Sequence, residues 1–181
     1  MRIAAVMTSL PERHDFRAEA IRAVEAQTLK PVAHFVGIDY ERVGPAEMLN
    51  RLLPACVAAS SDWVAQTADD DLWYPHHLET LAEHAADADI VYPYCDVEGR
   101  DWFDPNRPFD AAELRRQNFI PATTLIRTSL CVDLGWRSDA THGFEDWDFW
   151  LRALDAGARF VCVPEKTWLY RFHGANLSHA Y

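Results

Sequence analysis

The sequence has little cysteine and no pair of cysteines at metal-ligand spacing. Its four cysteines, Cys56, Cys95, Cys131 and Cys162, stand far apart in apolar surroundings. This spacing argues against a zinc site and indicates buried free thiols, so we expect a cytoplasmic protein.

The sequence also lacks a long apolar run and an excess of positive charge. No stretch approaches the length needed to span a bilayer, and residues 1–7 are too short an apolar run for a signal peptide. The formal net charge of −11 argues against a general nucleic-acid or anionic-membrane binder. A phosphate-bearing ligand would therefore need a metal or a local basic patch to offset the repulsion.

No internal repeat, low-complexity tract or linker divides the 181 residues, which suits a single domain over residues 1–181. Strand and helix patterns alternate in the first half and predict an α/β fold with a mostly parallel central sheet flanked by helices. The expected strands are residues 2–7, 34–39, 63–67, 90–92, 122–126, 160–163 and 168–172. The expected helices are residues 16–28, 45–53, 75–86, 129–134 and 145–156.

Three adjacent carboxylates, Asp69, Asp70 and Asp71, follow the strand predicted at residues 63–67. They repel one another, so a cation must offset the cost of placing them together. The carboxyl edge of an open α/β sheet is where such folds bind ligands, and carboxylate oxygens suit Mg²⁺ or Mn²⁺ carrying a phosphate. The alternative is a solvated acidic turn whose charges favour the start of the following helix.

Two further polar clusters occur later in the chain. Glu145, Asp146 and Asp148 begin a predicted helix, where they either meet the helix dipole or supply a carboxylate that accepts a proton from an attacking hydroxyl. Near the C-terminal end, Arg171 could meet a phosphate and His173 could complete a metal shell. A surface position is the alternative for His173.

In this order the motifs resemble those of the family 2 glycosyltransferases, inverting enzymes with the Rossmann-like GT-A fold. The resemblance covers nearly the whole chain and rests on five segments: Met-Thr-Ser-Leu-Pro-Glu-Arg at 7–13, Gln-Thr-Leu-Lys-Pro at 27–31 with Gly-Ile-Asp at 37–39, Ala-Asp-Asp-Asp-Leu-Trp-Tyr-Pro at 68–75, Glu-Asp-Trp-Asp-Phe-Trp-Leu-Arg at 145–152, and Tyr-Arg-Phe-His at 170–173 with Ser178.

The resemblance implies a nucleotide-binding half at residues 1–93 and an acceptor and catalytic half at residues 94–181. It implies Asp146 as the general base and Mn²⁺ or Mg²⁺ held by Asp70, Asp71 and His173. The expected nucleotide- and substrate-binding residues are Thr8, Leu10, Glu12, Arg13, Asp39, Asn50, Asp69, Glu145 and Arg171.

Two positions depart from the family pattern. Tyr40-Glu41-Arg42 follows Asp39, where the family has a second aspartate and Gly-Ser. The preferred nucleobase therefore stays open, although UDP is the commonest nucleotide in the family. Ala68 stands where the commonest metal motif has its first acid. This leaves open which of the three aspartates is the principal metal ligand.

We therefore expect an inverting, metal-dependent glycosyltransferase that moves a sugar from a nucleotide-diphosphate donor, with UDP as the first choice, to a hydroxyl acceptor. Candidates to contact the sugar or the acceptor are Trp102, Phe103, Asn118, Phe119 and Thr123. The alternative, which we favour for most of them, is that they fill a second small core. A nucleotidyltransferase is one alternative, although residues 8–13 contain no glycine for its phosphate loop. A non-catalytic binding module on a degenerate transferase fold is another. The oligomeric state stays open, with a homo-oligomer as one option.

Overall fold

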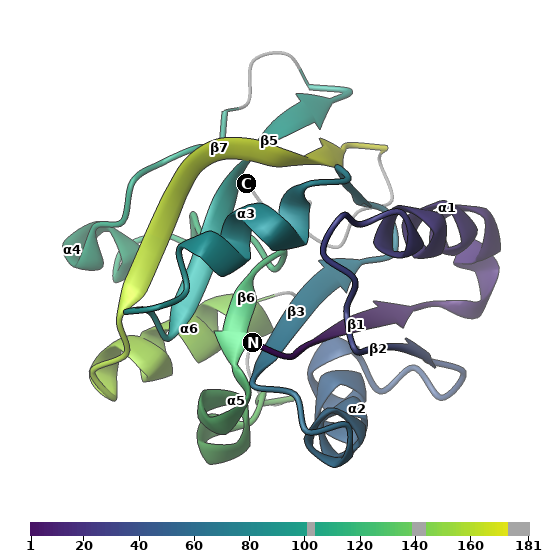
Figure 1. Cartoon of the computed structure of the whole chain (residues 1–181), viewed down its shortest axis with the longest axis horizontal. Coiled ribbons are helices and arrows are strands. Elements are labelled where there is room, and N and C mark those ends of the chain that lie inside the picture. Colours follow the sequence, from purple (N-terminus) through teal and green to yellow (C-terminus); the bar gives the residue numbers. More distant parts are fainter. Residues whose placement is uncertain (101–103, 139–143, 174–181) are drawn as a thin grey trace.

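A seven-stranded mixed sheet runs through the structure in the order β2-β1-β3-β6-β5-β7-β4 (Figure 1). The computed structural model describes residues 1–100, 104–138 and 144–173. The strands are β1 (Ile3–Ser9), β2 (Ala33–Ile38), β3 (Trp63–Ala68), β4 (Leu72–Trp73), β5 (Ile90–Glu98), β6 (Leu125–Arg127) and β7 (Phe160–Arg171). The helices are the 3₁₀ helix η1 (Pro11–Arg13), α1 (His14–Glu25), α2 (Pro45–Ala58), α3 (His77–Glu83), α4 (Ala111–Leu114), α5 (Thr128–Leu134) and α6 (Glu145–Asp155).

The first half of the sheet is parallel, as the strand and helix alternation predicts. β1 lies between β2 and β3 and pairs in parallel with both, so that Ala5 is opposite His34 on one side and Ala65 on the other. Strands that run in one direction end at the same edge of a sheet. The loops that follow β1, β2 and β3 therefore meet at one edge.

The second half of the sheet is mixed, and the prediction of a mostly parallel sheet is wrong there. β6 pairs antiparallel with both β3 and β5, and β4 pairs antiparallel with β7, whereas β5 and β7 are parallel. Among the residues described between β5 and β6, one short helix forms, α4. Leu125, the first residue of β6, lies opposite Val91, and the strand then runs to Arg127 against the direction of β5.

Two strands are longer than the sequence indicates. β5 continues through Pro93 to Glu98, and β7 joins the two late strands predicted at residues 160–163 and 168–172. The pairing of β5 with β7 shifts in register between Pro93 and Cys95. Such a bulge accommodates a proline, which has no N–H for the ladder.

The apolar core forms two clusters, one on each face of the sheet. Alternate residues of β1 divide between them: Ala4 and Val6 pack in the cluster that includes α2, α5 and α6, and Ile3 and Ala5 in the one that includes α1 and α3. The helices flank the sheet accordingly (Figure 1). Because both faces are covered, the edge formed by the strand ends is where ligands can enter.

The helices follow the predicted positions with small shifts. α6 ends at Asp155, and Gly157 has φ +81°, a conformation that favours glycine after a helix. α3 starts at His77, two residues later than predicted, and Leu72 and Trp73 form the unpredicted strand β4. In the described parts of the chain, no helix combines the length and the apolar character that a membrane crossing requires.

Candidate active site

A cavity of about 600 Å³ opens at the edge where β1, β2 and β3 end. Ligand sites typically enclose roughly 300–1,000 Å³. The irregular segment between β5 and β6 and the start of α6 complete its wall. The predicted site residues that line it are Thr8, Leu10, Arg13, Asp39, Asp69, Asp70, Asp71, Glu145 and Asp146.

The predicted metal site is centred on Asp69, Asp70 and Asp71, which we call the acidic run. The run follows β3, which is paired on both sides, and its residues are only 3–6 % exposed. A solvated acidic turn is therefore wrong for this segment. Buried carboxylates need partners, because desolvation penalises an isolated charge.

Arg13 and His173 are side-chain partners of carboxylates in the acidic run. Arg13 Nη1 donates to Asp69 Oδ1 over 2.9 Å and to Asp70 Oδ2 over 3.0 Å. His173 Nε2 lies 3.1 Å from the same Asp70 oxygen, and its ring stacks on Phe16. These contacts come from segments far apart in sequence, so the strand ends and the C-terminal end of β7 meet at the acidic run.

The acidic run retains oxygens that suit a divalent cation. Asp69 Oδ2 and Asp71 Oδ1 are buried and have no hydrogen-bond partner among the described residues. Burial, reinforced by neighbouring Asp70, raises the pKa of Asp71 well above its usual value. Unsatisfied buried carboxylate oxygens are the hard ligands that Mg²⁺ and Mn²⁺ take, so the donor chemistry fits such an ion.

In this arrangement of side chains, the guanidinium of Arg13 offsets negative charge on the acidic run. In the described part of the chain, no three histidine, cysteine, aspartate or glutamate side chains already converge as a metal-binding group. A cation at the acidic run would therefore require some side chains to move.

Asp146, the predicted base, stands at the start of α6 and faces the same cavity. Its Oδ2 accepts a hydrogen bond from Asn118 Nδ2 over 3.0 Å, and its Oδ1 accepts one from the backbone N–H of Trp147 over 2.7 Å. Burial, with a smaller contribution from Glu145, raises the pKa of Asp146 to about 7. A carboxylate that titrates near neutral pH is suited to accepting a proton in catalysis.

Asp39, the residue predicted to contact the nucleobase, lies in the loop between β2 and α2. Its Oδ1 accepts from the N–H of Val43 over 3.0 Å and its Oδ2 from the N–H of Gly44 over 2.8 Å. Burial opposes ionisation, but these backbone hydrogen bonds outweigh it and lower the pKa of Asp39. The carboxylate therefore remains charged at the cavity wall and can still accept a hydrogen bond from a ligand.

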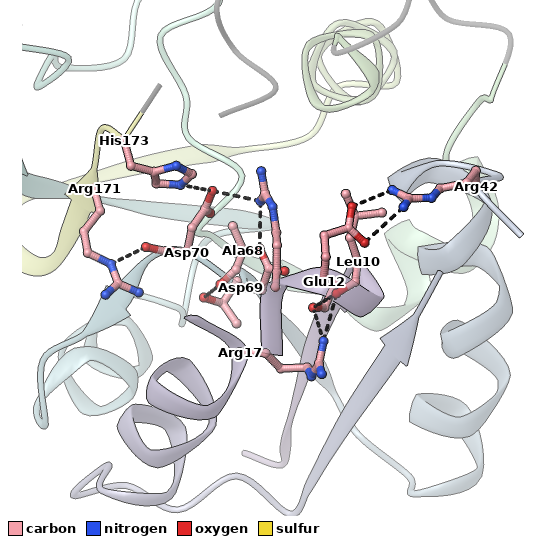
Figure 2. A network of polar contacts seen from close by, with 12 residues as sticks. Leu10, Glu12, Arg17, Arg42, Ala68, Asp69, Asp70, Arg171 and His173 are labelled. Atoms are coloured by element: carbon pink, nitrogen blue, oxygen red, sulfur yellow. Dashed lines mark hydrogen bonds and ion pairs between the residues drawn. The ribbon is translucent and has the colours of Figure 1, made fainter. Parts of the chain in front are cut away.

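Four predicted residues are not among those that line the cavity: Glu12, Asn50, Arg171 and His173. Glu12 pairs with Arg42, whose Nη1 is 2.9 Å from Glu12 Oε1 (Figure 2). Arg171 donates to the backbone carbonyl of Asp70 and pairs with Glu19. Arg42 therefore links η1 to the segment between β2 and α2, and Arg171 links α1 to the acidic run.

Asn50 has a structural position in place of the expected contact with the nucleotide. Its Nδ2 donates to the carbonyl of Trp136 over 2.7 Å, and its Oδ1 accepts from the N–H of Trp136 over 2.9 Å. Both polar ends of the side chain are engaged by one residue of the backbone. Asn50 thus positions Trp136, which does line the cavity.

The irregular middle contributes only part of what the sequence indicates. Asn118 and Phe119 line the cavity, whereas Thr123 is fully buried and does not. Trp102 and Phe103 lie outside the described residues. Cavity residues that sequence reasoning missed include Tyr92, Tyr94, Arg107, Gln117, Trp136, Trp168 and Tyr170.

Comparisons with known proteins place the fold. No protein-family model matches the chain. The chain is 25 % identical over 188 residues to the uncharacterized glycosyltransferase YwdF of Bacillus subtilis (strain 168), covering 87 % of this chain and 70 % of YwdF. Among solved structures, S. aureus TarS 1–349 in complex with UDP-GlcNAc has a TM-score of 0.74 at 15 % identity, covering 100 % of this chain and 62 % of that one.

A second solved structure gives the same result. The mannosyltransferase PcManGT from Pyrobaculum calidifontis, in complex with GDP-Man and Mn²⁺, has a TM-score of 0.70 at 16 % identity and covers 97 % of this chain. The chain has the fold of these GT-A glycosyltransferases and resembles YwdF in sequence. This confirms the resemblance drawn from the five sequence segments. The chain spans about three fifths of the length of the TarS 1–349 and PcManGT chains.

Proposed function

We propose that this GT-A chain is an inverting, metal-dependent glycosyltransferase that moves a sugar from a nucleoside-diphosphate donor to a hydroxyl acceptor. The observation that carries the proposal is the shared cavity of Asp146 and the acidic run. A carboxylate with a pKa near 7 thus faces the same space as a group of carboxylates that suits a cation and its phosphates.

The donor enters at the ends of β1 and β2. Thr8, Leu10 and Asp39 line this part of the cavity, and the charged Asp39 carboxylate can accept hydrogen bonds from the N–H groups of a base. TarS 1–349 has been solved with UDP and with UDP-GlcNAc, and PcManGT with GDP-Man. These complexes support a nucleotide sugar, and a UDP-sugar is our first choice.

The acidic run and His173 would hold the cation, which is Mn²⁺ or Mg²⁺. Asp70 and Asp71 are the expected ligands, and the unpartnered oxygen of Asp69 adds a third carboxylate nearby. When bound, such an ion neutralises the charge that develops on the diphosphate as it leaves. PcManGT, a relative in fold, was solved with Mn²⁺.

Asp146 would act as the general base. It takes the proton of the acceptor hydroxyl while that oxygen forms a bond to the anomeric carbon of the sugar. The bond from this carbon to the diphosphate oxygen breaks with its electron pair, and the nucleoside diphosphate departs from the opposite face. One base and one displacement invert the anomeric centre, and no covalent sugar–enzyme bond forms.

Asn118 and the N–H of Trp147 fix the orientation of the Asp146 carboxylate for this step. Asn118 comes from the irregular segment between β5 and β6, which the sequence assigns to the acceptor. Phe119 and Trp136 also line this side of the cavity. Aromatic faces at this position suit an acceptor that contains a sugar ring.

Donor hydrolysis tests the proposal without knowledge of the acceptor. With an α-linked UDP-sugar and Mn²⁺, water should replace the acceptor, and NMR should detect the β anomer as the first product. Asp146→Asn should slow this reaction by roughly 10²–10⁴-fold. An α product would contradict inversion, and an unchanged rate in Asp146→Asn would contradict Asp146 as the base. Absence of hydrolysis above the protein-free rate in wild type would favour the non-catalytic binding module.

A further inference from the structure

Arg13 places a positive charge between two carboxylates of the acidic run. Its Nη1 contacts Asp69 and Asp70 at 2.9 and 3.0 Å, and its side chain is only 15 % exposed. Hydrogen bonds between a guanidinium and carboxylates in a buried site are among the strong ones in proteins. Arg13 is therefore a counter-ion of the acidic run.

The loop that carries Arg13 is anchored independently of the acidic run (Figure 2). Arg17 Nη1 donates to the carbonyl of Leu10 over 2.9 Å and to Ser9 Oγ over 2.8 Å. On the other side of η1, Glu12 pairs with Arg42. The backbone of η1 is thus held in place, so that the Arg13 side chain can move away while its loop stays.

The guanidinium of Arg13 does not satisfy all the carboxylate oxygens of the acidic run. Asp69 Oδ2 and Asp71 Oδ1 remain buried without a hydrogen-bond partner among the described residues, although Arg13 and His173 lie beside the run. A divalent cation brings twice the charge and takes six or more oxygen ligands. The two cations would compete for the oxygens of Asp69 and Asp70.

We propose that Arg13 is a built-in counter-ion that the divalent metal displaces, which makes the metal and the donor diphosphate bind together. This inference rests on the proposed function, because it uses the same metal site. Without nucleotide, the metal must break both contacts of Arg13 and binds weakly. With nucleotide, the displaced guanidinium gains the diphosphate as a new anionic partner, since Arg13 lines the same cavity.

The proposal predicts a positive coupling between metal and nucleotide that passes through Arg13. Coupling of this kind is reciprocal, so UDP should strengthen Mn²⁺ binding by the same factor as Mn²⁺ strengthens UDP binding. Without Arg13, the competition disappears and so does the gain from the freed guanidinium.

Calorimetric titration with Mn²⁺, in the absence and presence of UDP, tests this with Arg13→Gln. Mn²⁺ alone should bind Arg13→Gln about tenfold or more tightly than wild type, because the metal no longer breaks charge-assisted hydrogen bonds. The increase in Mn²⁺ affinity caused by UDP should be smaller in Arg13→Gln than in wild type. Arg159→Gln is the matched control, because Arg159 also pairs with an aspartate, Asp89, but does not line the cavity, and its Mn²⁺ affinity should equal that of wild type.

If removing Arg13 impairs folding, thermal unfolding provides a second test. The thermal midpoint of Arg13→Gln should be lower than that of wild type without metal and should recover with Mn²⁺, whereas Arg159→Gln should show no such recovery. Arg13→Lys, which keeps the charge but not the guanidinium geometry, should bind Mn²⁺ with intermediate affinity.

Two negative outcomes have different meanings. Equal or weaker Mn²⁺ binding by Arg13→Gln would overturn the role of Arg13 while leaving the metal-dependent glycosyltransferase intact. Absence of Mn²⁺ binding in wild type, in Arg13→Gln and in both with UDP would overturn the metal site itself, and the role of Arg13 with it.

Discussion

Asn118 Nδ2 donates a hydrogen bond to Asp146 Oδ2 over 3.0 Å, which joins the irregular segment before β6 to the start of α6. This bond favours the charged form of Asp146, whereas burial favours the neutral form and raises the pKa to about 7. The protonation state of the proposed base therefore changes within the neutral pH range.

The rate of sugar transfer should depend on pH in the direction set by Asp146. The base acts only when ionised, so kcat should rise as pH increases through about 7 and then level off. Donor turnover measured from pH 5 to 9 at saturating donor and Mn²⁺ checks this. A rate that is already maximal at pH 5 would contradict the assignment.

Asn118→Ala should move this pH profile upward. The hydrogen bond from Asn118 stabilises the ionised carboxylate, whereas burial destabilises it. Without this bond, the apparent pKa of Asp146 should rise above that of wild type. The loss of rate should be large at pH 6 and should shrink at pH 9, where the carboxylate is ionised in both proteins. A loss of the same size at every pH would indicate that Asn118 only maintains local structure.

Asp146→Asn should remove activity and yet stabilise the protein above neutral pH. The folded pKa of about 7 lies above the ordinary value of 3.8, so the folded state binds more protons than the unfolded state between these values. Stability is then lost as pH rises from about 4 to 7 and stays lower above that range. At pH 8 the variant should be more stable by up to about 4 kcal/mol, and at pH 4 the gain should vanish. Chemical denaturation at the two pH values measures this, and a gain that is equal at both would refute the explanation.

Asp39→Asn should weaken both the loop and nucleotide binding. In the variant an NH2 donor replaces one of the two oxygens, so the N–H of Val43 or of Gly44 would face a donor in place of its acceptor, and stability should fall by about 1–3 kcal/mol. Denaturation and UDP titration check the two effects. Asp15→Asn is a suitable control, because the Asp15 side chain is 91 % exposed, and neither quantity should change in it.

The sequence predicts the parts of this molecule that depend on local pattern and misses those that depend on where a segment lies in space. Alternating strands and helices were sufficient for the parallel half, and the acidic run and Asp146 lie in one cavity as expected. The direction of β6 was not predictable, because it depends on the path of the irregular segment before it.

Side-chain partners were the least predictable feature of the site. Asn50 occurs at a plausible position for ligand binding, but both ends of its amide engage the backbone of Trp136, 86 residues away in sequence. Tyr92 and Tyr94 line the cavity, and their spacing of two residues was a signal of a strand face. Pro93 between them made the strand appear to end early.

Thermal unfolding with a panel of nucleoside diphosphates, each with and without Mn²⁺, tests the central claim most directly. A ligand at a hundred times its dissociation constant stabilises the fold by about 2.7 kcal/mol. One nucleotide should raise the thermal midpoint of wild type only when Mn²⁺ is present, and Asp70→Asn should lose that shift. If no nucleotide shifts wild type, or if the shift persists unchanged in Asp70→Asn, then the acidic run does not hold a metal–nucleotide donor.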